Sequence, residues 1–260
     1  MLGGLRMIKI RNLSKKFNVG TDFEKVIFDG FNLDIENNTS TAIIGSNGCG
    51  KSTLLNLIAG SLKIDDGTIE VDGEDIAKLK EEKRAKYIGR VHQNPSMGVA
   101  PSLTILENMS IADKKNEKFG LNKLVKKDRI IYYKEQLKTL DLGLENMLDT
   151  KVKFLSGGQR QSLSLLMASM KHPKILLLDE HTAALDPKTS KVVMDKSVEL
   201  IKDRNITTLM ITHDMKDAVE YSDRIIMLEE GRLVLDKKSS EITPEELYKI
   251  YEEKIKNLTM

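Results

Sequence analysis

A glycine-rich segment that follows an apolar run constrains the fold of this chain more than any other feature. The segment Gly45–Ser52 reads GSNGCGKS and matches the pattern G-x-x-x-x-G-K-[S/T]. It lies between the apolar run Ala42–Ile44 and a helical pattern of leucine and isoleucine that ends at Gly60. Glycine lets the backbone curl so that successive N–H groups point inward, and the positive end of the helix dipole adds to their field. The sequence therefore predicts a strand, a phosphate-binding loop and a helix, in place of a glycine-rich turn that binds nothing.

The residue types in this segment predict a nucleoside triphosphate as the ligand. Lys51 is expected to reach the β- and γ-phosphates, and the Ser52 hydroxyl is expected to bind Mg²⁺. Thr53 is expected to add a contact with the α-phosphate. The predicted nucleotide-binding residues of the segment are Gly45, Ser46, Asn47, Gly48, Cys49, Gly50, Lys51, Ser52 and Thr53.

A second stretch places carboxylates at the end of an apolar strand. Asp179 and Glu180 directly follow the apolar run Ile175–Leu178. In open α/β sheets ligands bind at the carboxyl ends of the strands, so these side chains are expected beside the phosphate loop. Asp179 is expected to hold Mg²⁺ through water, and Glu180 to polarise the attacking water as a general base. An acidic strand end that meets only solvent is the alternative.

The single cysteine of the chain, Cys49, lies inside the phosphate-binding segment, and one cysteine excludes an intramolecular disulfide. One interpretation is that its thiol only fills space. The other rests on its position at a helix N-terminus, which favours a lowered thiol pKa. That hypothesis predicts that thiol reagents inhibit nucleotide hydrolysis and that bound nucleotide protects against them.

The stretch Leu155–Gln159 (LSGGQ) predicts a second anion site. A serine followed by glycines is also a suitable helix start, and both interpretations can hold together. One chain with one phosphate loop does not need two phosphate sites for one nucleotide. We therefore predict a head-to-tail homodimer in which this site covers the nucleotide held by the other copy. Its predicted contact residues are Ser156, Gly157, Gly158 and Gln159.

Short apolar runs alternate with helical patterns, which predicts an α/β fold with a mainly parallel sheet covered on both faces. Strands are expected near 68–71, 87–92, 175–178, 207–211, 225–228 and 232–235, and helices near 187–202 and 215–221. The 260 residues include 41 Lys and Arg, 39 Asp and Glu, and 5% aromatic residues. This charge balance and aromatic content argue against a nucleic-acid binder. No apolar run approaches the roughly 20 residues of a membrane helix.

Together these motifs make the chain, from about Met7 to Leu235, resemble the ATP-binding subunits of ABC transporters. The resemblance implies a P-loop NTPase fold of the ABC ATPase type, with a mainly parallel core sheet, an antiparallel β subdomain and an inserted helical subdomain. It implies a nucleotide-binding core with the β subdomain over 7–93, a helical signature subdomain over 94–168, the core continued over 169–235 and a C-terminal amphipathic helix over 236–260. The implied cofactors are ATP and Mg²⁺, and the implied activity is transport-coupled ATP hydrolysis.

The resemblance also assigns roles to residues outside these motifs. Gln93 matches a glutamine that approaches Mg²⁺ and the attacking water, and His213 matches the switch histidine that contacts the γ-phosphate. Asp186 matches a residue that communicates across the dimer, although aspartate before proline is also a good helix N-cap. Phe17 lies where the family places an aromatic ring that stacks on adenine, and an ordinary core phenylalanine is the alternative. The implied catalytic residues are Glu180, His213 and Gln93, and the implied metal-binding residues are Ser52, Gln93 and Asp179.

Some features receive no chemical role. His181 follows Glu180 where many family members have proline, and residues 1–6 are left unassigned. The stretch 113–138 has nine basic and four acidic side chains, a net charge of +5, and is interpreted as a solvated helical face or as a face near anionic lipid. The closing amphipathic helix is expected to pack on its own domain. Its apolar positions are Leu247, Ile250, Tyr251, Ile255 and Leu258.

As a function, the resemblance implies that ATP-driven dimer closure energises solute transport. The implied partners are a permease on a separate chain and an extracytoplasmic substrate-binding protein, with this chain on the cytoplasmic side of the membrane. The stretches 93–104 and 180–187 resemble an importer branch that in some members is linked to aromatic amino-acid uptake. The alternatives are an exporter or lipoprotein-release ATPase and a soluble ABC ATPase. The single cassette, the lack of a long coiled-coil insertion and the near-neutral charge argue against the soluble class.

Overall fold

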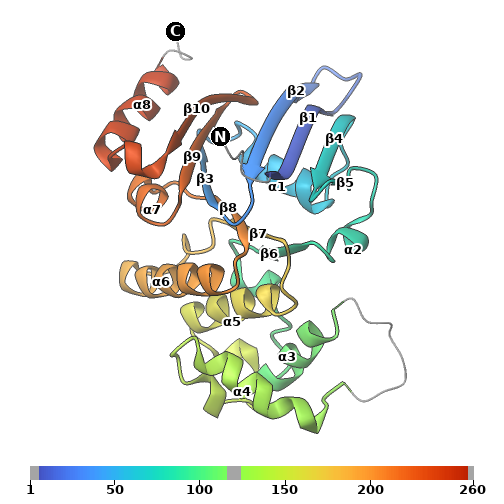
Figure 1. Ribbon diagram of the computed structural model, residues 1–260, viewed down its shortest axis with the longest axis vertical. Helices are drawn as coiled ribbons and strands as arrows, with labels where there is room; N and C mark the ends of the chain where they lie inside the picture. The colour runs from blue at the N-terminus through green and yellow to red at the C-terminus, as the bar shows by residue number, and fades with distance from the viewer. Residues whose placement is uncertain (1–5, 116–123, 257–260) are drawn as a thin grey trace. The chain divides into compact units, whose positions relative to one another are not determined.

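The structure is a computed structural model that describes residues 6–115 and 124–256 (Figure 1). The described residues up to 88 and those from 206 onward form one compact unit, and residues 89–205 form a second. Three groups of residues named above lie outside the described chain: residues 1–5, the charged residues Glu117, Lys118 and Lys123, and Leu258. The predicted subdomain boundaries are not decided by this division and remain predictions.

The first unit contains an antiparallel sheet in the strand order β2-β1-β4-β5. Phe31, Leu33 and Ile35 of β2 are buried, whereas Asn32 and Glu36 are exposed, which is the alternation of a strand with one face in the core. The sheet consists of β1 (Arg6–Phe17), β2 (Lys25–Glu36), β4 (Asp66–Val71) and the two-residue β5 (Glu74–Asp75).

A second set of strands in the first unit has the order β10-β9-β3-β8. The predicted parallel core is confirmed here, because β3 pairs in parallel with both β8 and β9, and β10 is the antiparallel edge. The core strands are buried along most of their length, as expected for parallel strands. Their bounds are Ser40–Gly45 for β3, Thr207–Ile211 for β8, Arg224–Glu229 for β9 and Arg232–Lys238 for β10.

The closing helix of the first unit starts with a side-chain cap that its local sequence provides. Thr243 and Glu246 form a capping box, in which the Glu246 N–H donates to Thr243 Oγ1 and the Thr243 N–H donates to Glu246 Oε2. The helices are α1 (Lys51–Ala59), α2 (Glu81–Arg84), α7 (Met215–Glu220) and α8 (Pro244–Lys256). The short α2 was not predicted.

The fully buried Arg84 of α2 holds the far end of α1. Its guanidinium donates to the carbonyl oxygens of Leu57 and Ile58, at 2.5 and 2.9 Å, and to the carbonyl oxygen of Ala77 at 2.7 Å. Carbonyl groups in the last turn of a helix have no partner within the helix. A side chain from another segment therefore satisfies the end of the helix that follows the phosphate loop.

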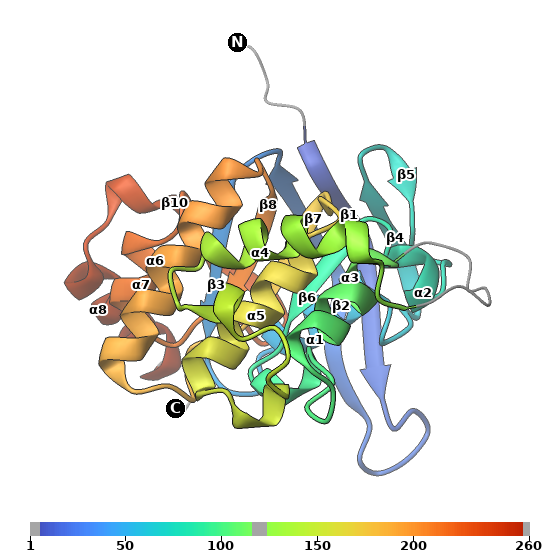
Figure 2. The same cartoon turned by 90° about the horizontal axis from the view of Figure 1, so that it is seen from below.

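The second unit packs its helices around an apolar core (Figure 2). Helices α3, α4 and α5 lie side by side, and α5 also packs on α6. The buried side chains between them include Ile105, Met109, Tyr133, Leu137, Leu163 and Leu166. The elements are β6 (Ile88–Val91), α3 (Ile105–Asp113), α4 (Ile130–Lys138), α5 (Gly157–Ser169), β7 (Ile175–Asp179) and α6 (Pro187–Asp203). Short 3₁₀ turns connect the helices of the segment 94–156.

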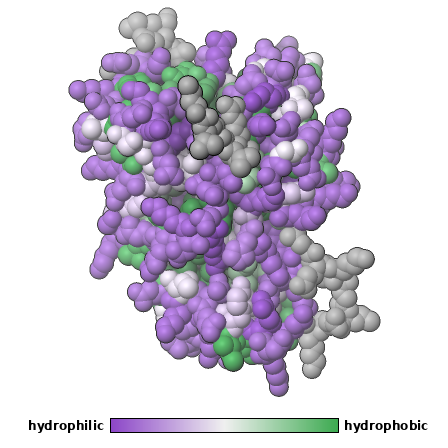
Figure 3. Space-filling view, in the orientation of Figure 1, coloured by the Kyte–Doolittle hydropathy of each residue, from purple (hydrophilic) through white to green (hydrophobic). Residues whose placement is uncertain are grey.

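Hydrophilic side chains cover most of the face seen in Figure 3. Within the described ranges, no helix has both the length and the apolar character needed to span a membrane.

Candidate functional site

The predicted strand, loop and helix are confirmed as local structure, because β3 ends at Gly45 and α1 begins at Lys51. Both Gly45 and Gly50 have positive φ angles, of 146° and 114°. A Cβ atom on Gly45 would lie 2.1 Å from the carbonyl oxygen of Leu228, and one on Gly50 would lie 2.8 Å from Cζ of Phe28. Glycine is therefore required at both positions by the backbone conformation and by the close approach of neighbouring segments.

The N-terminus of α1 has a glycine as its N-cap, and this residue provides no side-chain acceptor. Lys51 is buried, and its Nζ donates to the carbonyl oxygens of Gly45 and Ser46, each at 2.8 Å. A helix N-terminus with a glycine cap, and with a lysine held inside the preceding loop, suits an anion.

Glu229, at the end of β9, holds the loop from one side. Ser46 Oγ donates to Glu229 Oε1 at 2.6 Å, and the Ser46 N–H donates to Glu229 Oε2 at 3.4 Å. The Gly231 N–H donates to the carbonyl oxygen of Cys49 at 3.1 Å. Nothing in the sequence predicts these contacts, because 183 positions separate Ser46 from Glu229 and no local pattern marks the pair.

The hypothesis of a lowered Cys49 pKa is wrong. Burial raises the pKa of this thiol, and the nearby Lys51 ammonium only partly opposes the effect. The Cβ point built on Gly45 lies 2.8 Å from the Cys49 Sγ atom, so the thiol fills the space beneath that glycine. The space-filling interpretation therefore fits the structure, and an activated thiol does not.

In the second unit, the structure brings together Gln93 and Glu180. The Gln93 Nε2 group donates to Glu180 Oε2 at 3.0 Å, and Glu180 itself has a positive φ of 45°. Asp179 is half-buried, and its Oδ2 lies 3.3 Å from the Arg90 guanidinium, a contact that the sequence analysis did not predict. An amide and a carboxylate joined in this way can orient one water molecule.

His181, to which the sequence gave no role, anchors the segment that follows Glu180. Its ring is buried, and Nε2 lies 3.2 Å from Oγ of Ser197 on α6. Because Ser197 Oγ donates to the carbonyl oxygen of Val193, it is free to accept a hydrogen bond from the ring. Burial lowers the pKa of His181 to about 4, so the ring is neutral at ordinary pH.

The LSGGQ stretch starts α5 with a complete capping box. Ser156 Oγ accepts the Gln159 N–H at 3.2 Å, and the Ser156 N–H donates to Gln159 Oε1 at 3.1 Å. A Cβ on Gly158 would lie 2.4 Å from Cγ2 of Thr189 on α6, so the close approach of that helix requires glycine. Asp186 caps α6, because its Oδ1 accepts the Thr189 N–H at 3.1 Å. The predicted helix starts at Ser156 and Asp186 are confirmed.

Phe17 and His213 belong to the first unit. Phe17 ends β1, and the Lys15 Nζ lies 5.4 Å from the centre of its ring. Lys15 is fixed in turn by Asp65 at 2.7 Å. His213 is exposed and follows β8. Gln93, Asp179, Glu180 and residues 156–159 belong to the second unit.

The predicted Mg²⁺ ligands have suitable chemistry. Mg²⁺ prefers hard oxygen ligands and is commonly held by one or two carboxylates together with substrate phosphates and water. Ser52 offers an exposed side chain in the first turn of α1, Gln93 offers an amide oxygen, and Asp179 offers a carboxylate. In the part of the chain that the structure describes, no group of three or more His, Cys, Asp or Glu could hold a metal by itself.

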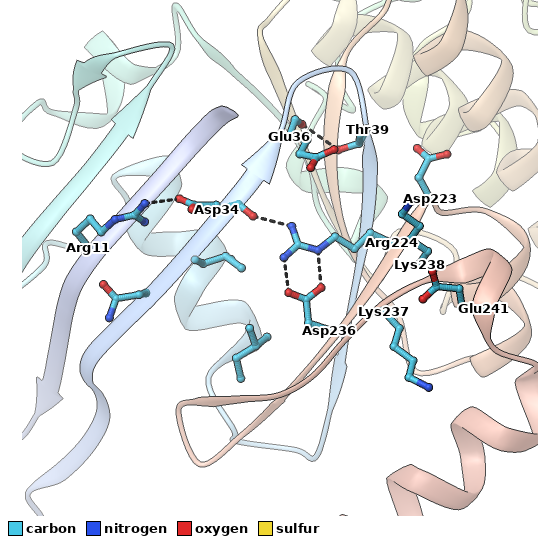
Figure 4. A pocket seen from close by; sticks show the side chains of 13 residues that line it. Arg11, Asp34, Glu36, Thr39, Asp223, Arg224, Asp236, Lys237, Lys238 and Glu241 are labelled. Carbon is cyan, nitrogen blue, oxygen red and sulfur yellow. Dashed lines mark hydrogen bonds and ion pairs between the residues drawn. The ribbon is translucent and has the colours of Figure 1, made fainter. Parts of the chain in front are cut away.

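A pocket in the first unit lies between β2 and the β9–β10 hairpin (Figure 4). Two ion pairs lie in it, because Arg224 forms two hydrogen bonds with Asp236 and Arg11 pairs with Asp34 at 2.7 Å. None of the predicted site residues is among the described residues that line it. The phosphate loop therefore stays the candidate site of this unit.

A family model described as ABC transporter matches residues 28–183, more than half of the chain. A tyrosine transport ATP-binding protein of Clostridioides difficile is 47% identical over 249 residues, which cover 95% of this chain and 99% of the relative. The chain belongs to the ABC transporter family. The spermidine/putrescine import ATP-binding protein PotA of Haemophilus influenzae is 37% identical over 91% of this chain, and the match covers 59% of PotA.

Solved structures of ABC cassettes confirm the predicted fold. The ADP conformation of MJ1267, an ATP-binding cassette of an ABC transporter, gives a TM-score of 0.78 with 26% identity over 95% of each chain. The dimeric post-hydrolysis state of the cassette MJ0796, bound to ADP and phosphate, gives 0.75 with 30% identity, covering 90% of this chain and 99% of that one. This ABC protein is thus an ATPase with a P-loop α/β fold and acts as the ATP-binding subunit of a transporter.

Proposed function

We propose that this ABC ATPase energises the import of an amino acid by ATP-driven closure of a head-to-tail homodimer. The observation that carries the proposal is the phosphate loop, with the glycine-capped N-terminus of α1 and Lys51 buried inside it. The 47% identity with a protein named for tyrosine transport supports an amino acid, and an aromatic one in particular, as the cargo.

Each predicted residue has a role in the proposed reaction. The loop N–H groups and Lys51 bind the β- and γ-phosphates, and the Phe17 ring stacks on adenine. Glu180 takes a proton from the attacking water, which Gln93 helps to orient through the contact between their side chains. His213 stabilises the charge that develops on the γ-phosphate.

Ser52 and Asp179, together with Gln93, are the proposed Mg²⁺ ligands. When bound, Mg²⁺ supplies charge neutralisation of the phosphate oxygens.

The proposed dimer closure depends on the LSGGQ stretch at the start of α5. Ser156 Oγ accepts a hydrogen bond from its own helix, and its hydroxyl hydrogen stays available to donate to a γ-phosphate held by the other copy. ATP then adds contacts that exist only in the closed dimer, and hydrolysis removes them. The dimeric cassette MJ0796 bound to ADP and phosphate supports this arrangement.

The proposed partners are a permease on a separate chain and an extracytoplasmic substrate-binding protein, with the ATPase on the cytoplasmic face of the membrane. The named import function of the PotA relative supports an importer. An exporter or lipoprotein-release ATPase is the competing function. A soluble ABC ATPase finds no support among these relatives, which are named for transport or import.

The Glu180→Gln variant tests the mechanism. We expect it to bind ATP, to hydrolyse it at least about 100-fold more slowly, and to accumulate as a dimer in ATP and Mg²⁺. Gel filtration with light scattering and a phosphate-release assay measure these outcomes. Glu199→Gln is the matched control, because Glu199 is exposed, pairs with the nearby Lys196 and belongs to the same unit. A monomeric Glu180→Gln variant at saturating ATP would falsify dimer closure.

The cargo is tested by co-purification. We expect a multi-span permease to be retained on the tagged ATPase, and the reconstituted pair with its binding protein to take up labelled tyrosine only with ATP. ATP-driven movement of a substrate in the opposite direction would establish the exporter instead.

A further inference from the structure

We propose that Lys25 is a second phosphate-binding cation of the nucleotide site, and that it acts from outside the phosphate loop. This inference rests on the proposed nucleotide binding by that loop. Lys25 belongs to neither the glycine-rich segment nor the LSGGQ stretch.

The position of Lys25 in the β1–β2 hairpin brings it to the loop. Lys25 is the first residue of β2 and pairs with Phe17 in the register of the two strands. Its Nζ lies 3.7 Å from the point that a Cβ on Gly48 would occupy. The ammonium group therefore stands beside the middle of the phosphate loop.

More of β2 packs against the same loop. A Cβ atom added to Gly50 would lie 2.8 Å from Cζ of Phe28 and 3.2 Å from Cγ2 of Ile27. The strand from which Lys25 extends is thus held against the loop by two buried side chains.

The charged groups around the loop do not neutralise the Lys25 ammonium. Lys51 already donates to two loop carbonyls, and the Glu229 carboxylate adds negative charge at Ser46. Glu24, next to Lys25 in sequence, accepts the Gly20 N–H and lies 3.8 Å from Lys16. Among the described residues, none forms an ion pair with Lys25. A phosphate oxygen is the anionic group that this ammonium suits best.

The pairing of Lys25 with Phe17 also fixes which part of the nucleotide it binds. One hairpin end presents a ring for the base and, directly opposite on the next strand, a cation for the phosphates. Lys51 is the residue expected to reach the terminal phosphates. Lys25 therefore binds the diphosphate portion that ADP and ATP share, and contributes equally to the affinity for both.

The test compares Lys25→Gln, Lys25→Arg and the control Lys16→Gln, a lysine of the same hairpin that faces Glu24. Dissociation constants for ADP, ATP and adenosine are measured by calorimetry on the full chain at two salt concentrations. We expect Lys25→Gln to weaken ADP and ATP binding by about tenfold, with a smaller salt dependence. Adenosine binding should stay unchanged, Lys25→Arg should restore most of the affinity, and Lys16→Gln should match the wild type.

The result that overturns the inference is ADP binding by Lys25→Gln within twofold of the wild type, or an equal loss for adenosine. Wild-type protein that binds no nucleotide would overturn the proposed function and this inference with it. If the wild type binds ADP and Lys25→Gln binds it equally well, the inference about Lys25 is overturned and the proposed function is not. Because Lys25 is exposed, all three variants should melt at the temperature of the wild type.

Discussion

The helices α1 and α5 begin in opposite ways. Helix α1 starts at Gly50, which provides no side-chain acceptor, whereas α5 starts at Ser156 with both hydrogen bonds of a capping box. Both starts contain glycine and both lie in sequence motifs of the same family. The difference is that the cap of α1 makes no side-chain hydrogen bond, while Ser156 accepts one from its own helix and keeps one hydroxyl hydrogen to donate.

Side-chain caps start helices in both units, since in the first unit α7 begins with the Asp214 cap and α8 with the capping box of Thr243 and Glu246. In the second unit, α3 also begins with a capping box, from Thr104 and Glu107, and α6 begins with the Asp186 cap. In the first unit, α1 is held at its C-terminus by Arg84 from another segment. The glycine N-cap of α1 sets it apart from these capped helices, and it lies in the predicted phosphate-binding loop.

The largest expected effect is on ADP binding, and it comes from placing a side chain at the N-cap of α1. Gly50→Ala should weaken ADP binding by about 100-fold, because alanine is strained at a φ of 114° and its Cβ meets Phe28. Equilibrium binding of a fluorescent ADP analogue measures this. Gly20→Ala is the control, since Gly20 also has a positive φ but has open space around it. Wild-type affinity in Gly50→Ala would show that the loop conformation is not needed for binding.

Asp113 lies at the centre of a charge network in the second unit. Removing its charge should lower the free energy of unfolding by about 2 kcal/mol at pH 7. Burial raises the pKa of Asp113, but hydrogen bonds from Arg129, Lys171 and Tyr133 outweigh it and lower the pKa from 3.8 to about 2. The ionised carboxylate thus stabilises the folded state above pH 4, and this stabilisation is lost as the pH falls from about 4 to about 2.

Asp113→Asn should therefore be destabilised at pH 7, and its difference from the wild type should shrink toward pH 2. Urea unfolding at a series of pH values measures this. Asp195→Asn, which removes an exposed ion pair on α6, should change stability by less than about 0.5 kcal/mol at any pH. A pH-independent difference for Asp113→Asn would assign its effect to packing and not to charge.

The smallest stability effect is expected at the α5 cap, where function and stability can be separated. Ser156→Ala should cost about 1 kcal/mol, because the Gln159 N–H loses its acceptor. Thr104→Ala removes the equivalent cap of α3 and should cost about as much. Thermal unfolding compares the two variants, and nucleotide binding by the single chain should stay normal in both.

Only Ser156→Ala should lose ATPase activity and ATP-dependent dimer formation. Equal activity in the two cap variants would mean that Ser156 only caps α5. The difference between the starts of α1 and α5 would then concern helix stability and not dimer formation.

Much of the fold and of each local site could be predicted from the sequence. The strand–loop–helix at Gly45–Ser52 and the caps at Ser156, Asp186 and Thr243 follow from residues within a few positions of one another. Such features depend on backbone conformations and hydrogen bonds that a short segment forms by itself. The two-residue β5 and the four-residue α2 escaped prediction, because neither is long enough to show a period.

Only the tertiary structure decided the contacts between distant segments. The sequence places Cys49 at a helix N-terminus and so favours a low pKa, yet the packing around it buries the thiol and raises that pKa. Ser46 meets Glu229, Arg84 meets the end of α1, His181 meets Ser197, and Lys25 reaches the loop at Gly48. The physical reason is that burial and electrostatic environment depend on which strands pair and which helices pack, and no single segment carries that information.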